Sequence, residues 1–436
     1  MTTVDTTAKT GGIQYWHKIV VLLCLGWTVM WIYRPVLTAI FPEVQQTIGP
    51  QSNTELGLIA SCYFFAYTAM QIPAGMLVDK FGKKAVVIPG FLLFTIAALI
   101  IGNAHSIMMI YVGSLLAGLG CGSYYGSAWS LSAENIPSEH RGFASAIINT
   151  GSALGMGISL LATSFLVKSW GMPWEYMLYI IAALLLCLVA GFAIIIKEQP
   201  KLKQAVQNDT TNNQTTTSPI KSDQKHSFFS IEMIASYIMY FATCYGYYMI
   251  VSWLPNFLET ERGFTGGSIG SASSLVAFAA IPGALIISKI SDKFRSKRLL
   301  FIIVLELIAA GTLFITVQSA TITFLLAGLI FYGLFGKLTV EPILISHVAE
   351  TAPKTNYGTS FGVFNFFGMS SSVIAPPLTG YLADLTGTKI TGFYVAIVIL
   401  IVATLIFTLI NSKKKLTTNK HHYRSDAYDR LNQYKQ

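Results

Sequence analysis

Twelve long apolar stretches, separated by short polar segments, constrain this sequence more than any other feature. Each is close to the roughly 20 residues that a helix needs to cross the hydrocarbon core of a bilayer. In hydrocarbon a chain must satisfy its own backbone hydrogen bonds, so such stretches predict helices. They are residues 18–41, 56–78, 85–103, 106–131, 143–167, 175–196, 229–257, 267–290, 299–318, 320–347, 358–384 and 390–411. The sequence therefore predicts an all-α membrane protein with twelve transmembrane helices.

The charged residues are few, and their positions predict a topology. Of the 436 residues 53% are hydrophobic and 11% are charged, whereas soluble domains carry about 25% charged residues. Of the 29 Lys and Arg, 23 lie on the side of the two termini, and the opposite loops hold only Lys168, Arg262 and Lys389. The positive-inside rule then predicts both termini in the cytoplasm of a bacterial cell with the chain in its inner membrane. The net charge of +9 is thus explained by topology, and we expect no nucleic-acid partner.

No constellation of residues suggests catalysis, a metal site or a cofactor. The five cysteines all fall inside predicted helices without metal-ligand spacing, which favours buried thiols. There is no Gly-x-x-x-x-Gly-Lys-(Ser/Thr) phosphate loop, so hydrolysis of ATP by this chain is not expected. We expect no enzyme activity.

A polar segment divides the twelve helices into two sets of six. Residues 197–228 are rich in Thr, Asn, Gln and Lys, a composition typical of a flexible linker. The expected organisation is an N-terminal tail (1–17), a six-helix half (18–196), the cytoplasmic linker (197–228), a second six-helix half (229–411) and a C-terminal tail (412–436). The C-terminal tail is polar, and we expect it to be disordered.

An internal repeat supports this division. The segment "GMLVDKFGKK" (75–84) is echoed by "SKISDKFRSKR" (288–298), which places Asp79 and Asp292 213 residues apart. The segment "ENIPSEHRG" pairs with "ETAPKTNYG", so that Glu134 and Glu350 are 216 residues apart. Two duplicated helical halves, with the substrate held between them near the midplane, are a recognised architecture of secondary transporters.

With these motifs the chain resembles the major facilitator superfamily over about residues 15–412. The segment "GMLVDKFGKK" fits that superfamily's loop signature after helix 2. Within the superfamily, four features resemble the anion:cation symporter family: Arg34, "YTAMQIPAG", "WLPNFLETERGF" and "APPLTGYLADLTGT". The resemblance implies two pseudo-symmetric six-helix halves and transport by alternating access.

Arg34 is the first candidate for substrate binding. A cation near the middle of a membrane helix costs about 2.5–3.5 kcal/mol on insertion scales, so it favours a functional role over a structural one. Its guanidinium offers a planar fork of donors that matches a carboxylate, and the matching arginine of the resembled family binds the substrate's carboxylate. The other candidate cavity residues are aromatic side chains and amides: Tyr33, Tyr67, Tyr124, Asn149, Tyr245, Tyr248 and Asn365.

The predicted tenth helix contains the best candidates for proton coupling. Lys337 and Glu341 are four residues apart and share a helical face, which favours an ion pair, either static or coupled to a proton. His347, further along, is a second candidate relay. The proton-coupled members of the resembled family carry acidic residues where this chain has Tyr33 and "GCGSYYGSA" (120–128). Glu306, alone in its window, faces either the cavity or a polar contact.

The repeated loops predict a cytoplasmic gate. In the resembled superfamily the aspartate of this loop caps a helix N-terminus, where the helix dipole favours an anion, and pairs with an arginine. The gating candidates are Asp79, Lys83, Lys84 and Arg141 in the first half, and Asp292 and Arg298 in the second.

The leading hypothesis is a monomeric secondary transporter that imports a small carboxylate-bearing solute, such as an organic anion or an amino acid, with protons. The partners that this implies are the solute, protons and the lipid bilayer. Three alternatives remain: uptake of a nucleoside or other nutrient without anion recognition, efflux of amphipathic drugs, and solute sensing by a transporter-like protein.

Overall fold

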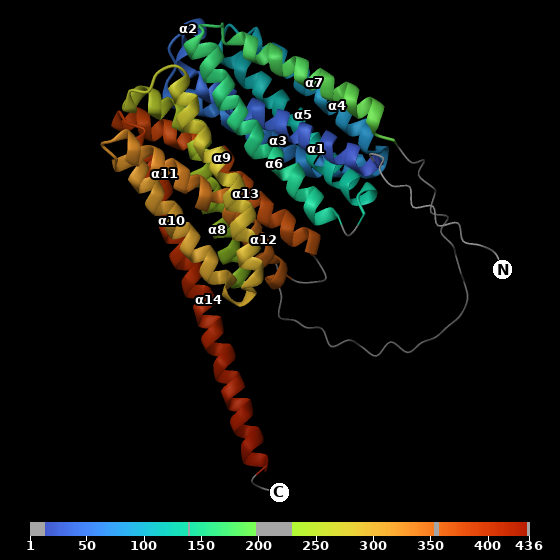
Figure 1. The fold of residues 1–436 in the computed structure, drawn as a ribbon, viewed down its shortest axis with the longest axis vertical. Coiled ribbons are helices and arrows are strands. Elements are labelled where there is room, and N and C mark those ends of the chain that lie inside the picture. The colour runs from blue at the N-terminus through green and yellow to red at the C-terminus, as the bar shows by residue number, and fades with distance from the viewer. Residues whose placement is uncertain (1–13, 138–139, 198–228, 353–356, 434–436) are drawn as a thin grey trace, which may run out of the picture. The chain divides into compact units, whose positions relative to one another are not determined.

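The computed structural model describes residues 14–137, 140–197, 229–352 and 357–433, and these ranges are helical apart from short connections (Figure 1). The first eight helical elements are α1 (Tyr15–Ala39), α2 (Phe41–Ile48), α3 (Asn53–Phe81), α4 (Lys83–Gly102), α5 (Ile107–Asn135), α6 (Arg141–Thr163), the π-helix η1 (Ser164–Ser169) and α7 (Glu175–Ile195). The others are α8 (Ile231–Arg262), α9 (Gly267–Lys293), the 3₁₀-helix η2 (Arg295–Lys297), α10 (Arg298–Gln318), α11 (Ile322–Phe335), α12 (Lys337–Thr351), α13 (Tyr357–Thr386) and α14 (Ile390–Gln433).

The prediction of twelve transmembrane helices is confirmed. In the described ranges twelve helical segments are long and apolar enough to cross a membrane, and each overlaps one of the twelve predicted windows. The described residues contain no β-strand. The chain is therefore an all-α, multi-pass membrane protein.

The described helices form two compact units. The first contains the described residues of 1–49 and 65–198, and the second contains residues 50–64 and those of 199–436. In the first unit α1 packs against α6 and α7, and α4 packs against α5 and α7. In the second, α8 packs against α12, α13 and α14, while α11 contacts α9 and α10. The boundary inside α3 assigns the beginning of that helix, from Asn53, to the second unit.

Small residues set a close helix contact in the first unit. A Cβ atom on Gly151 would lie 2.6 Å from the Cys24 carbonyl oxygen, and one on Gly155 would lie 2.2 Å from that of Thr28. On the same face of α6, Ser159 donates a hydrogen bond of 2.6 Å to the carbonyl of Ile32. This contact fixes α1, and with it Arg34, against α6, as small residues do between membrane helices.

The predicted tenth helix is wrong in one respect, because residues 320–347 do not form one continuous helix. α11 ends at Phe335 and α12 begins at Lys337. Gly336 lies between them, and a Cβ atom there would stand 2.5 Å from the Tyr332 carbonyl oxygen. Only glycine fits this close approach without a shift. Lys337 therefore stands at the first turn of a new helix.

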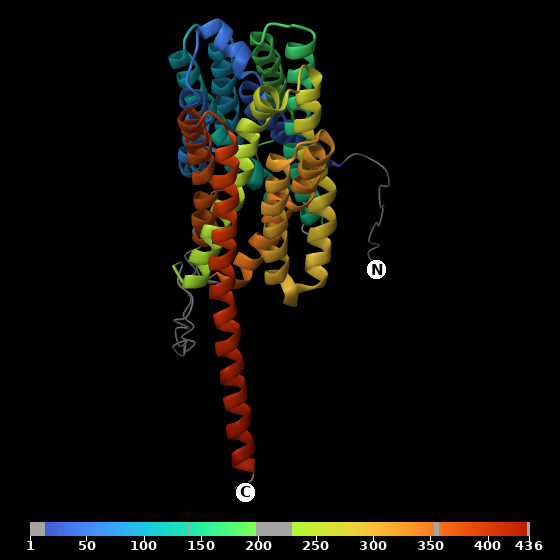
Figure 2. The ribbon, with the colours of Figure 1, turned by 90° about the vertical axis from the view of Figure 1, so that its left-hand side faces the viewer.

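The expectation of a disordered C-terminal tail is also wrong for most of its length. α14 continues from Ile390 to Gln433 as one helix (Figure 2). Residues 413–433 contain neither glycine nor proline, so no helix-breaking residue ends the membrane helix where its apolar sequence stops. Most of the predicted linker, residues 198–228, lies outside the described residues.

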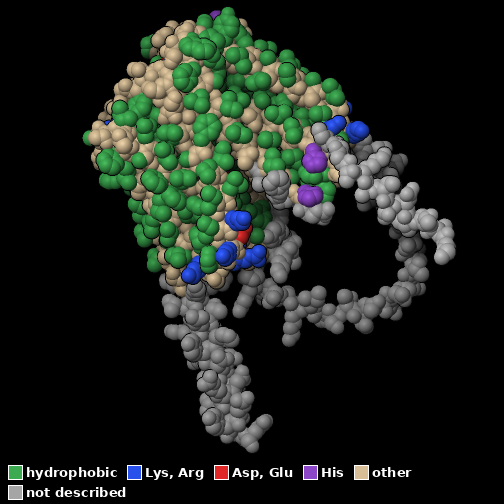
Figure 3. All heavy atoms as spheres, in the orientation of Figure 1, with side chains coloured by type: hydrophobic (Ala, Val, Ile, Leu, Met, Phe, Trp, Pro, Cys, Tyr) green, Lys and Arg blue, Asp and Glu red, His purple; other side chains and the backbone are tan. Residues whose placement is uncertain are grey.

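The surface carries many apolar side chains, as a lipid-facing protein requires. Ile72 and Met76 on α3 and Ile194 on α7 are 76%, 68% and 79% exposed. In the space-filling view of one face, hydrophobic side chains are spread over the whole described surface, and the few Lys and Arg that are visible lie along its edges (Figure 3).

We expect Gly155→Ala to lower the thermal unfolding temperature of the purified protein. The added methyl group would meet the Thr28 carbonyl, and overpacking of this kind costs about 1–3 kcal/mol. The matched control is Gly311→Ala on α10, because a Cβ there meets nothing within 4 Å. Equal unfolding temperatures for the two variants would show that the α1–α6 contact is not this tight.

Candidate functional site

Arg34 lies inside an aromatic cage in the first unit. It is 9% exposed, and its Cζ lies 4.3 Å from the ring centroid of Trp31, 4.9 Å from that of Tyr67 and 5.9 Å from that of Trp27. Trp27, Trp31 and Arg34 follow the i, i+4, i+7 spacing of one helical face, and Tyr67 comes from α3. Ring faces stabilise a buried guanidinium through cation–π attraction.

The rings of the cage are uncharged, so they leave the positive charge of the guanidinium in place. An aromatic ring interacts with the flat face of the group, whereas a carboxylate binds its in-plane N–H donors. The Tyr67 hydroxyl is hydrogen-bonded to the side chains of Arg34 and Gln71. The arrangement holds a permanent positive charge with fixed orientation, which suits recognition of a small anion.

The other candidates of the first unit differ in their relation to this cage. Tyr124 is 2% exposed; its ring stacks on Trp27 at 5.7 Å and its hydroxyl donates to the Leu23 carbonyl. Tyr33 is 4% exposed, with its ring edge against Phe94 at 4.9 Å. Asn149 on α6 is exposed. The structure therefore brings Tyr67 and Tyr124 to the cage.

In the second unit the structure brings Lys337 and Glu341 together. Lys337 Nζ donates to Glu341 Oε2 at 2.8 Å, and the Tyr240 hydroxyl on α8 donates to Glu341 Oε1. Lys337 is 8% exposed and lies 5.4 Å from the ring centroid of Tyr247. Glu341 is more open, since its side chain is 24% exposed. The pair shields a buried cation, and its acid is partly exposed.

The remaining candidates of the second unit lie around α8 and α13. Tyr245 is buried, and the Tyr248 hydroxyl lies 3.5 Å from the sulfur of Met369. Asn365 is half-buried on α13. His347 is buried on α12, with its ring edge against Phe407 at 5.5 Å.

The candidate gating residues form matching ion pairs in the two units. Lys83, at the start of α4, pairs with Glu134, near the end of α5. Arg298, at the start of α10, pairs with Glu350, near the end of α12, and lies 3.3 Å from Asp292. Glu134 and Glu350 were not predicted as partners, although their repeat spacing was a usable signal. Lys84 donates to the Ala193 carbonyl at 2.6 Å; the side chains of Asp79 and Arg141 lie outside the described residues.

A further anchor, which sequence reasoning missed, involves Asp384 near the end of α13. One carboxylate oxygen accepts hydrogen bonds from the backbone and side-chain nitrogens of Asn53 at 2.9 and 2.8 Å. The other accepts from the backbone nitrogen and hydroxyl of Thr54 at 2.9 and 2.6 Å. Asp384 thus caps the N-terminus of α3, where backbone donors and the helix dipole both favour an anion. We call this contact the α3 cap.

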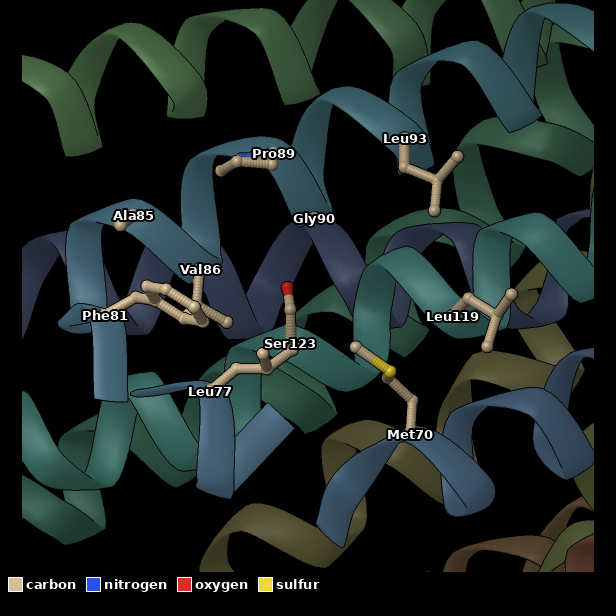
Figure 4. Close-up of a pocket in the computed structure, with 10 residues that line it drawn as sticks. All are labelled: Met70, Leu77, Phe81, Ala85, Val86, Pro89, Gly90, Leu93, Leu119 and Ser123. Atoms are coloured by element: carbon tan, nitrogen blue, oxygen red, sulfur yellow. The ribbon is translucent and has the colours of Figure 1, made fainter. Parts of the chain in front are cut away.

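The first unit also contains an apolar pocket with a volume of about 330 Å³. Its lining comes from α3, α4 and α5 and consists of Met70, Leu77, Phe81, Ala85, Val86, Pro89, Gly90, Leu93, Leu119 and Ser123 (Figure 4). Ser123 supplies its one hydroxyl group, and none of the lining residues is charged. Arg34 and Tyr67 are absent from the lining, so this pocket does not include the aromatic cage. Among the described residues no group of three or more His, Cys, Asp or Glu could hold a metal ion.

Comparison with known proteins agrees with the fold. The family model of the Major Facilitator Superfamily matches residues 19–376 and 236–426. A probable sulfoacetate transporter of Cupriavidus necator is 26% identical over 91% of this chain and 94% of its own length. A probable galactarate/D-glucarate transporter of Escherichia coli is 25% identical (88% and 91%), and a hexuronate transporter of Bacillus subtilis is 21% identical (87% and 90%).

A solved structure shares the fold at low identity. A bacterial homologue of the human lysosomal transporter Spinster, in an inward-facing and occupied conformation, superimposes with a TM-score of 0.76 at 15% identity. The match covers 92% of this chain and 98% of that one.

We expect Asp384→Asn to destabilise the protein by about 1–2 kcal/mol, the range typical for loss of a helix cap. In the asparagine variant, an NH₂ group replaces one of the two carboxylate oxygens. It would then face the donors of either Asn53 or Thr54 and could not accept their hydrogen bonds. Thr54→Val removes a single hydroxyl donor of the cap and should have a smaller effect. Thermal unfolding in detergent measures both, and an Asp384→Asn variant as stable as the wild type would contradict the α3 cap.

Proposed function

Because the chain belongs to the major facilitator superfamily, we propose that it imports a small carboxylate-bearing solute by alternating access, in symport with protons. It is a membrane transporter rather than an enzyme. Its proposed location is the bacterial inner membrane with both termini in the cytoplasm, which the asymmetric distribution of Lys and Arg supports. We propose that it acts as a monomer.

The observation that carries the substrate class is Arg34 in its aromatic cage. A buried, permanently charged guanidinium with neutral rings around it is complementary to an anion and cannot itself carry a proton. The relatives named above are described as transporters of sulfoacetate, galactarate or glucarate, and hexuronate, all organic acids. Sugar acids and related organic acids are therefore the first substrates to test, with amino acids second.

The proposed conformational cycle moves the two six-helix halves, residues 18–196 and 229–411, against each other. The loops that contain Asp79 and Asp292 are proposed to control the cytoplasmic gate, through the ion pairs of Lys83 and Arg298. The α3 cap gives the beginning of α3 a fixed attachment to α13, and we propose that it breaks and re-forms during the cycle.

We expect a carboxylate substrate to raise the unfolding temperature of the wild-type protein but not of Arg34→Ala. Thermal shift with a panel of sugar acids, dicarboxylates, amino acids and nucleosides tests this. Arg34→Lys is the matched control, because it keeps the charge but loses the planar fork, and we expect roughly tenfold weaker binding. Stabilisation by a nucleoside, equal in wild type and Arg34→Ala, would favour nutrient uptake without anion recognition. Broad stabilisation by amphipathic drugs, indifferent to Arg34, would favour efflux.

We expect Glu341→Gln to abolish accumulation driven by a pH gradient while leaving solute exchange intact. The amide cannot bind and release a proton, yet it can still hydrogen-bond to Lys337 and Tyr240, which contact Glu341. Proteoliposomes with and without an imposed pH gradient measure the two activities. Loss of both, or of neither, would refute the coupling role. A protein that binds its solute tightly but exchanges none would be a sensor.

A further inference from the structure

Glu306 on α10 is the most deeply buried acidic side chain of the second unit that the mechanism above does not use. It is 1% exposed. Its Oε1 atom is hydrogen-bonded to the Thr243 hydroxyl on α8. Its other oxygen, Oε2, is buried and has no hydrogen-bond partner in the described part of the chain.

The hydrogen bonds of Thr243 indicate which partner holds the proton. Thr243 Oγ1 lies 2.9 Å from the carbonyl oxygen of Met239 and also contacts Glu306 Oε1. A hydroxyl group has one proton to donate, and an ionised carboxylate and a carbonyl are both acceptors. Both contacts are satisfied when Glu306 is a neutral acid: its O–H donates to Thr243, whose O–H donates to Met239.

The surroundings of Glu306 favour the neutral form for the same reason. From α8 the groups near it are Thr243 and the Cys244 thiol, and from α11 the Tyr332 hydroxyl. All of these are uncharged. A buried carboxylate without a cation or a full set of donors is far more costly than a neutral carboxylic acid.

The charged groups nearby are paired with each other. Lys337 and Glu341 of α12 interact electrostatically with Cys244, as does Glu306, but the ammonium of Lys337 is engaged by Glu341 at 2.8 Å. On α14, which also packs against α10, Tyr394 is the only titratable residue between 390 and 412, and it contacts Gln318 at the far end of α10.

We propose that Glu306 is a proton-binding site, separate from the Lys337–Glu341 pair, whose bound proton forms the hydrogen bond to Thr243. The proton resides on Oε1, and its release to water leaves a carboxylate with one negative charge. The role of Glu306 as a second proton carrier in the transport cycle depends on the proposed proton symport. The presence of a proton on Glu306 in this conformation depends only on the hydrogen-bond geometry.

Infrared difference spectroscopy of the purified protein tests the occupancy without any transport assay. At neutral pH the wild type should show the C=O stretch of a protonated carboxylic acid that shifts in D₂O. Glu306→Gln should lose the equivalent of one such acid, and Glu341→Gln should retain it. Spectra of wild type and Glu306→Gln that match in this region would overturn the proposal.

A second variant keeps the test decisive if Glu306→Gln does not fold. Thr243→Val removes the acceptor of the Glu306 proton and leaves the acid in place. The band should then remain and move to the higher frequency of a carboxylic acid without a hydrogen bond. A band that does not move would show that the proton is not on the Glu306–Thr243 contact.

Transport by Glu306→Gln separates occupancy from coupling. If Glu306 exchanges its proton in each cycle, the variant should lose accumulation driven by a pH gradient and keep solute exchange. Unchanged accumulation together with the lost infrared band would overturn the coupling role, because the proton would then be a permanent one. If the wild type itself shows no proton-driven accumulation, the proposed symport fails while the infrared result stands.

Discussion

The high cost of an unpaired polar or charged group in hydrocarbon is the constraint on which the described structure depends. It forces the backbone into helices that satisfy their own hydrogen bonds, and it limits how an ionisable side chain can remain inside a unit. The structure shows two such arrangements and suggests a third. Arg34 is surrounded by aromatic rings, Lys337 is paired with Glu341, and the hydrogen bonds of Glu306 suit a neutral acid.

These arrangements differ in what they leave available for chemistry. The rings around Arg34 are uncharged, so its positive charge persists and remains available to attract an anion. In the ion pair, a proton on Glu341 would remove the partner of a buried cation, so that protonation and the position of Lys337 are linked. The neutral acid proposed for Glu306 behaves in the opposite way, because loss of its proton, rather than gain of one, leaves an unpaired buried charge. The proposed substrate anchor and the two acids proposed to bind protons thus have separate positions on α1, α10 and α12.

The sequence predicts whatever depends on local pattern, and it fails where contacts join distant segments. The twelve helices follow from apolar length, and the pairing of Lys337 with Glu341 follows from their spacing. Trp27 and Trp31 were within reach of the same reasoning, since they share a helical face with Arg34. Three contacts can be seen only in the folded structure: Tyr67 beside Arg34, the hydrogen bond from Tyr240 to Glu341, and the α3 cap. In the cap, Asp384 lies 331 and 330 residues along the chain from its two partners. The break at Gly336 was hidden because residues Ile322–Thr351 together are long and apolar enough to be taken for one membrane helix.

The internal repeat separates features that occur at equivalent positions in both halves from features that occur in one half only. The ion pairs Lys83–Glu134 and Arg298–Glu350 join equivalent helix ends in the two units, as expected for a device that each half needs. The intramembrane charges have no such counterparts. At the repeat offsets of 213 and 216 residues, the segments that correspond to Arg34, Glu306 and the Lys337–Glu341 pair are 247–250, 90–93 and 121–128, and none contains a charged residue. Duplication therefore explains the scaffold and its ion pairs, whereas the proposed anion anchor and the proposed proton-binding acids belong to one half each. A transporter that binds its solute through one half and its proton through the other can couple them only through the relative motion of the two halves.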